Sequence, residues 1–574
     1  MIAAGMETAA KAGAPAGAVT ERPAALGAAT LCEAFQTTAA ERGSSVALRT
    51  PGDGISITFG EYADRVRGVA GGLAGLGVGR GDTVAIMLVN RPEFHLVDTA
   101  ALHLGATPFS VYNTSTAEQI EYLFGNARNS VVVTERGFLP MLREVKGLEH
   151  VVIVDGDEAG TLPLSQLERS APDGFDFEAS WRAVQPEDVA TLIYTSGTTG
   201  PPKGVELTHA SLMAEVRSMV ARLPARPGGR STSFLPSAHI ADRWASHYQG
   251  SIVMGNTVTS IADPRAVVAH LPEVRPTVWG SVPRIWEKLK AALEAQGIAD
   301  PGKLSEDQRA SIRERLGLDQ CETLVVGAAP TPVEVLIFFR DLGLEICEVW
   351  GMSETSCCAT CNPSGAVKLG TCGPAIDACE LSLAEDGELL VRGELVMKGY
   401  RADPSKTREA IDEDGWLHTG DVAEIDEDGY LKIVDRKKEL IINAAGKNMS
   451  PANIEARLKA SHTLIGQAVA IGDRRPYNVA LIVLDPDACS AFAREHGLAD
   501  ASPAALAGDE RVREAVAAAI DEANAHLSRV EQIKRFEILP AEWEPGGLEL
   551  TPTMKLKRRP IAERYAEEIE ALYR

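Results

Sequence analysis

A run of small hydroxyl residues and glycines at residues 195–204 offers the clearest chemistry in the chain. Its sequence is Thr-Ser-Gly-Thr-Thr-Gly-Pro-Pro-Lys-Gly, and it follows an apolar stretch, residues 191–194, that predicts a strand. Glycines let backbone N–H groups converge on a phosphate, hydroxyls add donors, and a lysine adds positive charge. The run therefore predicts an anion-binding loop made by Thr195, Ser196, Gly197, Thr198, Thr199, Gly200 and Lys203.

Two common nucleotide motifs do not describe this loop. No Gly-Lys-Ser/Thr follows at the spacing of a Walker A loop, and no G-x-G-x-x-G opens a helix. The glycines at residues 75–81 come close, but their spacing fails and a strand is expected after them, which favours a turn. On composition alone, residues 195–204 could also be a flexible polar loop.

Six further segments carry side chains suited to catalysis or nucleotide binding. In chain order they are residues 235–243, 327–330, 350–355, 414–421, 429–438 and 550–559. Together with residues 194–204 they resemble the motifs of the adenylate-forming superfamily of acyl-CoA synthetases, luciferases and peptide-synthetase adenylation domains. They are most similar to long-chain fatty acyl-CoA synthetases. The resemblance covers nearly all of the chain after its N-terminal tail.

The resemblance assigns the nucleotide and metal contacts. Residues 327–330 resemble the loop that lies along adenine and the acyl carboxyl, and residues 350–355 resemble Tyr-Gly-x-Thr-Glu. Trp350 replaces the usual tyrosine but keeps an aromatic face for adenine. Ser353 replaces threonine and keeps a hydroxyl for the α-phosphate, and Glu354 would hold Mg²⁺. The implied ATP-binding set of these two segments is Gly327, Ala328, Ala329, Trp350, Gly351 and Met352.

Further roles follow from the same resemblance. Asp421 would accept hydrogen bonds from the ribose hydroxyls, with Arg436 beside it. His239 would line the path of the acyl group and the thiol, although an isolated histidine is more often structural. Asp435 and Lys438 would form a hinge. The implied path for coenzyme A contains Gly446, Lys447 and Asn448.

The catalytic lysine lies in residues 550–559, Leu-Thr-Pro-Thr-Met-Lys-Leu-Lys-Arg-Arg. If Leu556 occupies the place of the family's usual glycine, the lysine that follows, Lys557, is the catalytic residue. Lys555 is the competing candidate. The catalytic set expected from the sequence is thus Lys557, Glu354, His239 and Ser353.

The resemblance implies an AMP-forming acid–thiol ligase that uses Mg²⁺, ATP and coenzyme A on a long- or medium-chain fatty acid. The carboxylate attacks the α-phosphorus of ATP, and the acyl group then passes to coenzyme A after the C-terminal domain swings about its hinge. Three alternatives stay open: an aryl or pathway-specific acid, a carrier protein as acceptor, or a catalytically silent binding protein.

Composition limits the partners and the compartment. The formal net charge of -23 would repel nucleic acid. The 9 cysteines fit a reducing compartment, which makes a cytoplasmic location the expectation. Their cluster around residues 357–361 is read as small buried side chains rather than as a metal site. No apolar run reaches the roughly 20 residues of a membrane span, and peripheral membrane contact stays open.

The elements that must position these residues alternate between helix and strand. Helical spacing begins at Glu61, with a strand at 82–90, a helix at 93–104, a strand at 107–112, a helix at 118–124 and a strand at 130–134. This alternation predicts an α/β fold with doubly wound sheets, whose ligands bind at the carboxyl ends of strands. Asp-Gly turns in residues 375–434 predict a smaller β subdomain.

The predicted domains are a disordered tail at 1–30, an N-terminal domain at 31–435 that binds ATP and the acyl group, and a small mobile α+β C-terminal domain at 436–574 that carries the catalytic lysine.

Overall fold

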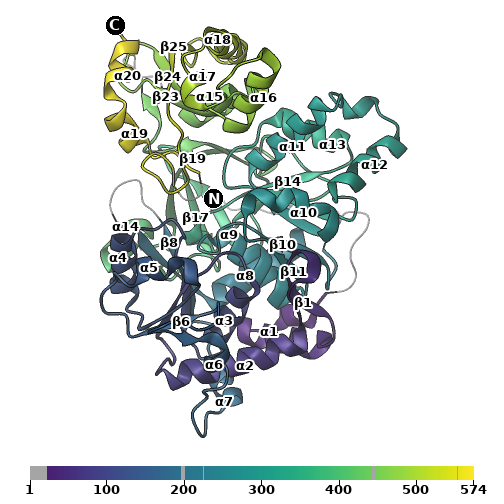
Figure 1. Ribbon diagram of the computed structural model, residues 1–574, viewed down its shortest axis with the longest axis vertical. Helices are drawn as coiled ribbons and strands as arrows, with labels where there is room; N and C mark the ends of the chain where they lie inside the picture. The colour runs from purple at the N-terminus through teal and green to yellow at the C-terminus, as the bar shows by residue number, and fades with distance from the viewer. Residues whose placement is uncertain (1–21, 196–200, 224, 443–447, 552–553) are drawn as a thin grey trace, which may run out of the picture.

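The computed structural model describes residues 22–195, 201–223, 225–442, 448–551 and 554–574. A large N-terminal domain forms the lower part of the molecule in Figure 1, and a separate, smaller C-terminal domain lies above it. Each has its own hydrophobic core: one cluster of buried residues runs from Ala25 to Leu431, and another from Ile441 to Ile538. The predicted α/β class with a separate C-terminal domain is confirmed. The boundary at residues 435 and 436 stays a prediction.

An eight-stranded sheet forms one layer of the N-terminal domain, in the order β18-β9-β8-β4-β3-β5-β6-β7. At its centre, β3 (Thr83–Met87) pairs in parallel with β4 (Thr107–Ser110) and β5 (Val131–Thr134). Val84 and Ile86 belong to the large core with α2 (Phe59–Gly75) and α3 (Pro92–His103). Ala85 and Met87 belong to a second core with α4 (Ala117–Ala127). Because side chains alternate along a strand, helices cover both faces of this sheet.

Two four-stranded sheets complete the α/β part of this domain. One has the order β10-β11-β1-β2, with β10 (Arg230–Ser233) and β11 (Thr257–Ser260) in parallel. The other has the order β12-β13-β14-β15, in which β12 (Val278–Ser281), β13 (Thr323–Val326) and β14 (Ile346–Trp350) are parallel. Parallel strands present their carboxyl ends at one edge, where ligands bind in open α/β sheets.

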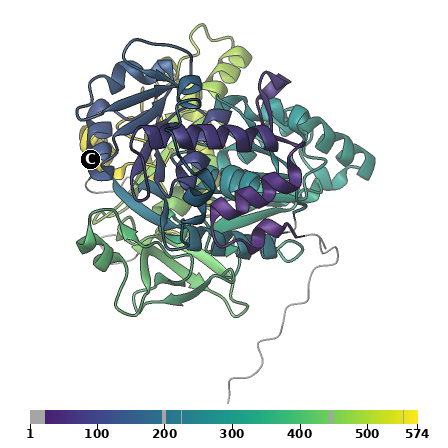
Figure 2. The ribbon, with the colours of Figure 1, turned by 90° about the horizontal axis from the view of Figure 1, so that it is seen from below.

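An antiparallel sheet forms the predicted β subdomain, in the order β16-β17-β19-β20. Its strands are β16 (Cys379–Leu383), β17 (Glu388–Gly393), β19 (Leu417–Ile425) and β20 (Leu431–Arg436). The glycines of the Asp-Gly turns, Gly387, Gly415 and Gly429, all have φ of +82°, a conformation that side chains disfavour. Figure 2 shows this sheet (green) set apart from the purple helices α1 (Leu31–Arg42) and α2.

The C-terminal domain is built on β23 (Ile465–Ile471), β24 (Asn478–Leu484) and β25 (Ile533–Ile538). Ala480 and Ile482 face the core shared with α15 (Pro451–Ser461) and α18 (Glu510–Ala525). Val479 and Leu481 face a second core with α19 (Arg558–Arg564) and α20 (Ala566–Leu572). Helices therefore cover both faces of this small sheet, which agrees with the predicted α+β character.

The described part of the predicted tail, residues 22–30, includes buried side chains. Residues 1–21 lie outside the described residues, but Ala25, Ala28 and Thr30 are buried. The guanidinium of Arg217 donates to the carbonyl oxygens of Leu26, at 2.9 Å, and Ala28, at 2.6 Å. These contacts fix an Ala-rich segment in place. Its small side chains show no helical or strand periodicity in the sequence.

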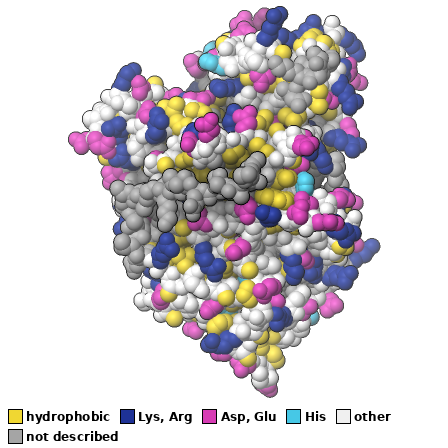
Figure 3. Space-filling model, turned by 180° about the vertical axis from the view of Figure 1, so that it is seen from behind, with side chains coloured by type: hydrophobic (Ala, Val, Ile, Leu, Met, Phe, Trp, Pro, Cys, Tyr) yellow, Lys and Arg dark blue, Asp and Glu magenta, His cyan; other side chains and the backbone are white. Residues whose placement is uncertain are grey.

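The molecular surface carries mixed charges. Acidic and basic side chains are interspersed over the face seen in Figure 3, with small hydrophobic patches between them. Among the described helices, none combines the length and the apolar character that crossing a bilayer requires. All nine cysteines are free thiols, five of them buried.

Candidate active site

The predicted phosphate loop connects two paired strands. β8 (Val189–Thr195) ends at Thr195, which lies opposite Lys203 at the start of β9 (Lys203–Thr208). The remaining loop residues of the prediction lie outside the described residues: Ser196, Gly197, Thr198, Thr199 and Gly200. The ammonium of Lys203 lies 4.5 Å from the ring centre of Tyr400. This cation–π contact holds a positive charge at the base of the loop.

The second group lies at the carboxyl ends of β13 and β14, two parallel neighbours. Gly327 follows β13, and a Cβ there would lie 2.8 Å from Cγ2 of Val349, so a side chain would collide. Ala328 has φ of +71° and is exposed with Ala329. Gly351 follows β14, and a Cβ there would lie 1.8 Å from the carbonyl oxygen of Cys357. Because of these close approaches, only backbone fits at Gly327 and Gly351, between the two strand ends.

The predicted metal ligand, the carboxylate of Glu354, is buried close to Gly351 in the chain. Ser353 and Glu354 lie in η7 (Ser353–Thr355) and are 9% and 7% exposed. The hydroxyl of Tyr400 donates to Oε1 of Glu354 at 2.9 Å. The backbone N–H of Met352 donates to the hydroxyl of Thr355 at 3.0 Å, which closes the turn. Among the described residues, Oε2 of Glu354 has no donor, and a carboxylate oxygen of this kind fits a hard cation such as Mg²⁺.

Tyr400 was not singled out from the sequence. It ends β18 (Gly399–Tyr400), the strand that pairs with the outer side of β9. Its hydroxyl binds Glu354 and its ring lies under Lys203, so it joins the metal carboxylate to the phosphate loop. Burial, followed by the charge of Glu354, raises the pKa of Tyr400 and keeps it a neutral donor. No local pattern marks this residue, because only the pairing of β18 with β9 brings it there.

The predicted ribose carboxylate sits between two donors. Asp421 lies in β19, directly opposite Arg436 in β20, and is 3% exposed. Nε of Arg436 lies 2.7 Å from Oδ1 of Asp421, and the indole N–H of Trp350 donates to Oδ2 at 2.9 Å. Burial raises the pKa of Asp421, while Arg436, Trp350 and Lys555 oppose that rise. The structure thus brings Trp350, Asp421 and Arg436 together, as the sequence predicted.

Lys555 and Lys557 have different surroundings. Lys555 has an exposed surface, but enough protein surrounds it that desolvation, and then the charge of Arg436, lowers its pKa. The carboxylates of Asp421, Glu439 and Glu354 oppose that shift. The ammonium of Lys557 instead donates to the carbonyl oxygen of Gly547 at 2.8 Å. Of the two lysines, Lys555 is the one whose charge acts on the predicted nucleotide site.

The backbone of the lysine segment supports the same choice. Leu550 and Leu556 form a bridge, and the backbone N–H of Lys555 donates to the hydroxyl of Thr551 at 2.9 Å. Met554, the residue before Lys555, has φ of +65°, the region that favours glycine. Met554 thus has the conformation that favours glycine, and Leu556, the position expected for the family's usual glycine, does not; which lysine is catalytic stays a prediction.

His239 lies half-buried near the lysine. It precedes α9 (Ile240–Asp242), and its Nδ1 accepts from the backbone N–H of Ala241 at 3.1 Å. Burial and the positive charge of Lys555 lower the pKa of His239 to about 4. The imidazole is therefore neutral near pH 7, and because Nδ1 accepts, its proton is on Nε2.

The predicted hinge separates the two cores. Asp435 is buried; its Oδ2 accepts from the hydroxyl of Ser450 at 2.5 Å and from the backbone N–H of Ala452 at 3.1 Å. Lys438 is exposed. Gly446 and Lys447 lie outside the described residues, and Asn448 starts β22 (Asn448–Met449) opposite Ile442. Their predicted role along the coenzyme A path stays a prediction.

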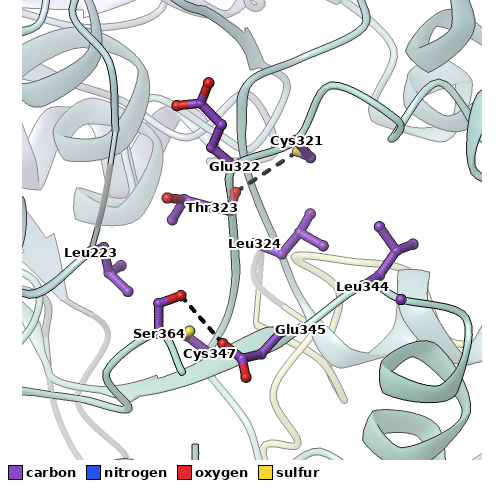
Figure 4. A pocket seen from close by; sticks show the side chains of 10 residues that line it. Leu223, Cys321, Glu322, Thr323, Leu324, Leu344, Glu345, Cys347 and Ser364 are labelled. Atoms are coloured by element: carbon purple, nitrogen blue, oxygen red, sulfur yellow. Dashed lines mark hydrogen bonds between the residues drawn. The ribbon is translucent and has the colours of Figure 1, made fainter. Parts of the chain in front are cut away.

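A cavity of about 170 Å³ lies beside the sheet that contains β13 and β14. Thr323, at the start of β13, lines it together with Leu344, Cys347 and Ser364, as the close-up in Figure 4 shows. The hydroxyl of Ser364 donates to Glu345 at 3.3 Å across its rim. Because Thr323 opens β13 while Gly327 follows its end, this cavity and the predicted nucleotide residues lie toward opposite ends of that strand.

Comparisons with known proteins find relatives over most of the chain. The chain is 54% identical over 451 residues to a putative fatty-acid–CoA ligase, fadD11, of Mycobacterium tuberculosis, covering 72% of this chain and 79% of that protein. It is 36% identical over 565 residues to the long-chain-fatty-acid–CoA ligase FadD15 of Mycobacterium bovis, covering 91% and 93%.

Solved structures share the fold at low identity. The adenylation domain of a carboxylic acid reductase from Segniliparus rugosus, in complex with AMP, superposes with a TM-score of 0.75 at 20% identity and covers 96% of each chain. The model of the AMP-binding enzyme family matches residues 35–401, and that of the AMP-binding enzyme C-terminal domain matches residues 438–574. The chain therefore belongs to the AMP-binding enzyme family.

Proposed function

We propose that this chain joins a long- or medium-chain fatty acid to coenzyme A through an acyl adenylate, releasing AMP and pyrophosphate. One observation carries the proposal: Asp421 pairs with Arg436 at 2.7 Å, and Lys555 lies close enough to Asp421, Arg436 and Glu354 for their charges to act on it. The two related fatty-acid–CoA ligases support the choice of acid and acceptor.

In the proposed first step, the nucleotide lies across the ends of β13 and β14. The indole face of Trp350 contacts adenine, and the carboxylate of Asp421 accepts from the ribose hydroxyls. Asp421 can do so while bound to Arg436 and Trp350, because a carboxylate has about four acceptor positions. Arg436 opposes the rise in pKa that burial causes at Asp421, and so favours the ionised carboxylate.

The acid's carboxylate oxygen then forms a bond to the α-phosphorus, and the bond from that phosphorus to the bridging oxygen breaks. Pyrophosphate leaves with the electron pair. Lys555 and Lys203 stabilise the charge that spreads over the phosphate oxygens. Mg²⁺, held by Oε2 of Glu354, would supply further positive charge to the phosphates. Tyr400 fixes the orientation of that carboxylate by its hydrogen bond.

In the proposed second step, the C-terminal domain rotates about residues 435–438 and withdraws Lys555. The thiol of coenzyme A loses its proton to solvent, the resulting thiolate sulfur bonds to the acyl carbon, and AMP leaves with the electrons of the carbon–oxygen bond. The neutral His239 presents Nε2–H as a donor along this path. The free thiols of the chain fit a reducing compartment such as the cytoplasm.

A direct assay tests the proposal. Purified protein with Mg-ATP and coenzyme A is given straight-chain acids from octanoate to oleate, and benzoate as an aryl acid, and the products are separated by mass. Acyl-CoA and AMP in equal amounts, greatest with the longer straight chains, are expected. Acyl-AMP without acyl-CoA would instead indicate a different acceptor such as a carrier protein. Failure of every straight-chain acid to give acyl-AMP would overturn the fatty-acid assignment.

A further inference from the structure

Helix α11 (Pro283–Ala295) carries two cations four residues apart, Arg284 and Lys288, which we name the α11 cation pair. Residues 282–288 also resemble a segment of long-chain acyl-CoA synthetases. Trp286, between them, is fully buried against Trp279 and Phe339, with ring centres 4.9 Å apart in each contact. Because Trp286 anchors the helix in the N-terminal domain, the α11 cation pair is held on its outer side.

The α11 cation pair contacts the C-terminal domain at the start of α16 (Pro486–His496). The guanidinium of Arg284 donates to Oδ2 of Asp485 at 2.6 Å, and the ammonium of Lys288 lies 2.9 Å from Oδ2 of Asp487. Oδ1 of Asp485 accepts from the backbone N–H groups of Asp487 and Ala488, both at 3.1 Å, and so caps the helix. One carboxylate therefore fixes both the helix end and the domain contact.

The same contact is rigidly connected to Lys555. β24 runs directly into Asp485, and Leu481 of β24 packs in one hydrophobic cluster with Leu550. Leu550 is bridged to Leu556, at the other end of the turn that contains Lys555. Figure 1 shows α11 and α16 on facing parts of the two domains. Movement of the C-terminal domain away from α11 would therefore carry Lys555 away from Asp421 and Glu354.

We propose that Arg284 and Lys288 are positioning residues that dock the C-terminal domain for adenylate formation. The proposal rests on the two-step function proposed above. The α11 cation pair touches no substrate. It favours the arrangement in which Lys555 faces the nucleotide site, and its contacts break when the domain rotates for thiol transfer. Its effect is therefore expected on the first half-reaction only.

The size of the effect is modest because both contacts are partly open to water. Exposed ion pairs contribute little individually and are screened by salt. A preference between two arrangements needs only a small bias to change their populations. For the double variant Arg284→Gln/Lys288→Gln, ATP–pyrophosphate exchange is expected to fall by about three- to tenfold. Acyl-CoA formation from supplied oleoyl-AMP is expected to be unchanged or faster.

Lys290→Gln is the matched control, because Lys290 lies on the same helix but pairs with Glu294 within the N-terminal domain, at 2.6 Å. It removes one charge from α11 and is expected to change neither half-reaction. The exchanged pair Lys288→Glu/Asp487→Lys is expected to recover most of the loss caused by Lys288→Glu alone. Equal losses in both half-reactions, or no recovery in the exchanged pair, would refute docking.

A measurement without substrate separates this proposal from the proposed function. A water-soluble carbodiimide joins an amine to a carboxylate only when the two are in contact. In the wild-type protein at low salt, an amide between Lys288 and Asp487 is expected, identified by mass spectrometry after digestion. High salt and Arg284→Gln should both weaken it. If this crosslink is absent, docking is wrong even in an active ligase. If the crosslink forms but no fatty acid is activated, the proposed function fails and the contact stands.

Discussion

The indole N–H of Trp350 donates to Oδ2 of Asp421 at 2.9 Å and thereby joins the end of β14 to β19 of the β subdomain. Arg436 occupies the other oxygen at 2.7 Å. The residue that takes the place of the family's tyrosine thus also orients the ribose carboxylate, a role that only a donor side chain can fill.

Replacing Trp350 by phenylalanine keeps an aromatic face but removes this donor. A lost hydrogen bond to a charged group costs about 1.5–3 kcal/mol. The KM for ATP is therefore expected to rise by roughly tenfold or more in steady-state assays, with a smaller change in the KM for the acid. Trp350→His offers a ring N–H and should recover part of the affinity. An unchanged KM for ATP in Trp350→Phe would show that the contact does not orient Asp421 for nucleotide.

Replacing Lys555 by alanine should reduce adenylate formation about 100-fold or more, the cost of removing one donor to a developing charge. Acyl-CoA formation from synthetic acyl-AMP should survive. Lys557→Ala loses the bond to Gly547 and should change adenylation only a few-fold. Half-reaction assays on both variants decide the matter. The opposite ranking would restore Lys557, the residue expected from the sequence.

Replacing Tyr400 by phenylalanine keeps the ring under Lys203 but frees Oε1 of Glu354. The concentration of Mg²⁺ needed for half-maximal adenylation is expected to rise several-fold, because the carboxylate loses its orientation. Tyr400→Leu, which also removes the cation–π contact, should in addition weaken ATP binding. If wild type and Tyr400→Phe needed the same concentration of Mg²⁺, this result would argue against Glu354 as a ligand of the metal.

Buried neutral histidines should make the protein acid-labile. His103 is fully buried, with Nδ1 donating to the carbonyl oxygen of Thr99 at 2.7 Å, and burial lowers its pKa to about 4. In the unfolded chain the pKa is about 6.5, so unfolding takes up a proton at intermediate pH. This contribution to stability is present above pH 6.5 and is lost as the pH falls toward 4. It amounts to up to about 3 kcal/mol.

Urea unfolding between pH 4 and 7.5 measures this slope, and His103→Gln should make it shallower. Lys438→Gln, at an exposed position, serves as the control and should leave the slope unchanged. A His103→Gln protein with the wild-type slope would show that His103 does not cause the acid sensitivity.

Most of the fold could be predicted because its signals are local. The expected strand at 107–112 is β4 (Thr107–Ser110), and the expected helix at 93–104 is α3 (Pro92–His103). Strand ends shifted by one to three residues, since backbone pairing rather than side-chain pattern ends a strand. Trp350, Asp421 and Arg436 could be singled out because each lies in a short motif, and the motifs occur in the order that the family shows.

The two candidate lysines, Lys555 and Lys557, differ by two residues of register. Both flank Leu556, and both alignments keep a basic residue at the catalytic position. The folded structure separates them: Met554, next to Lys555, adopts the left-handed conformation, and the ammonium of Lys557 donates to the carbonyl oxygen of Gly547. The contacts of Tyr400 and Arg284 could not be predicted from the sequence for a different reason. Each depends on an element that is distant in sequence: β9 for Tyr400 and the start of α16 for Arg284.

The candidate site draws its residues from three separate sheets, and they are translated in a fixed order. Lys203 comes first, Trp350 and Glu354 next, then Asp421 and Arg436, and Lys555 only 19 residues before the end. Because N-terminal parts of a chain fold first during synthesis, a nascent chain could bind nucleotide before it could activate an acid. Among the residues of the candidate site, the lysine segment is synthesised last and would therefore complete the site.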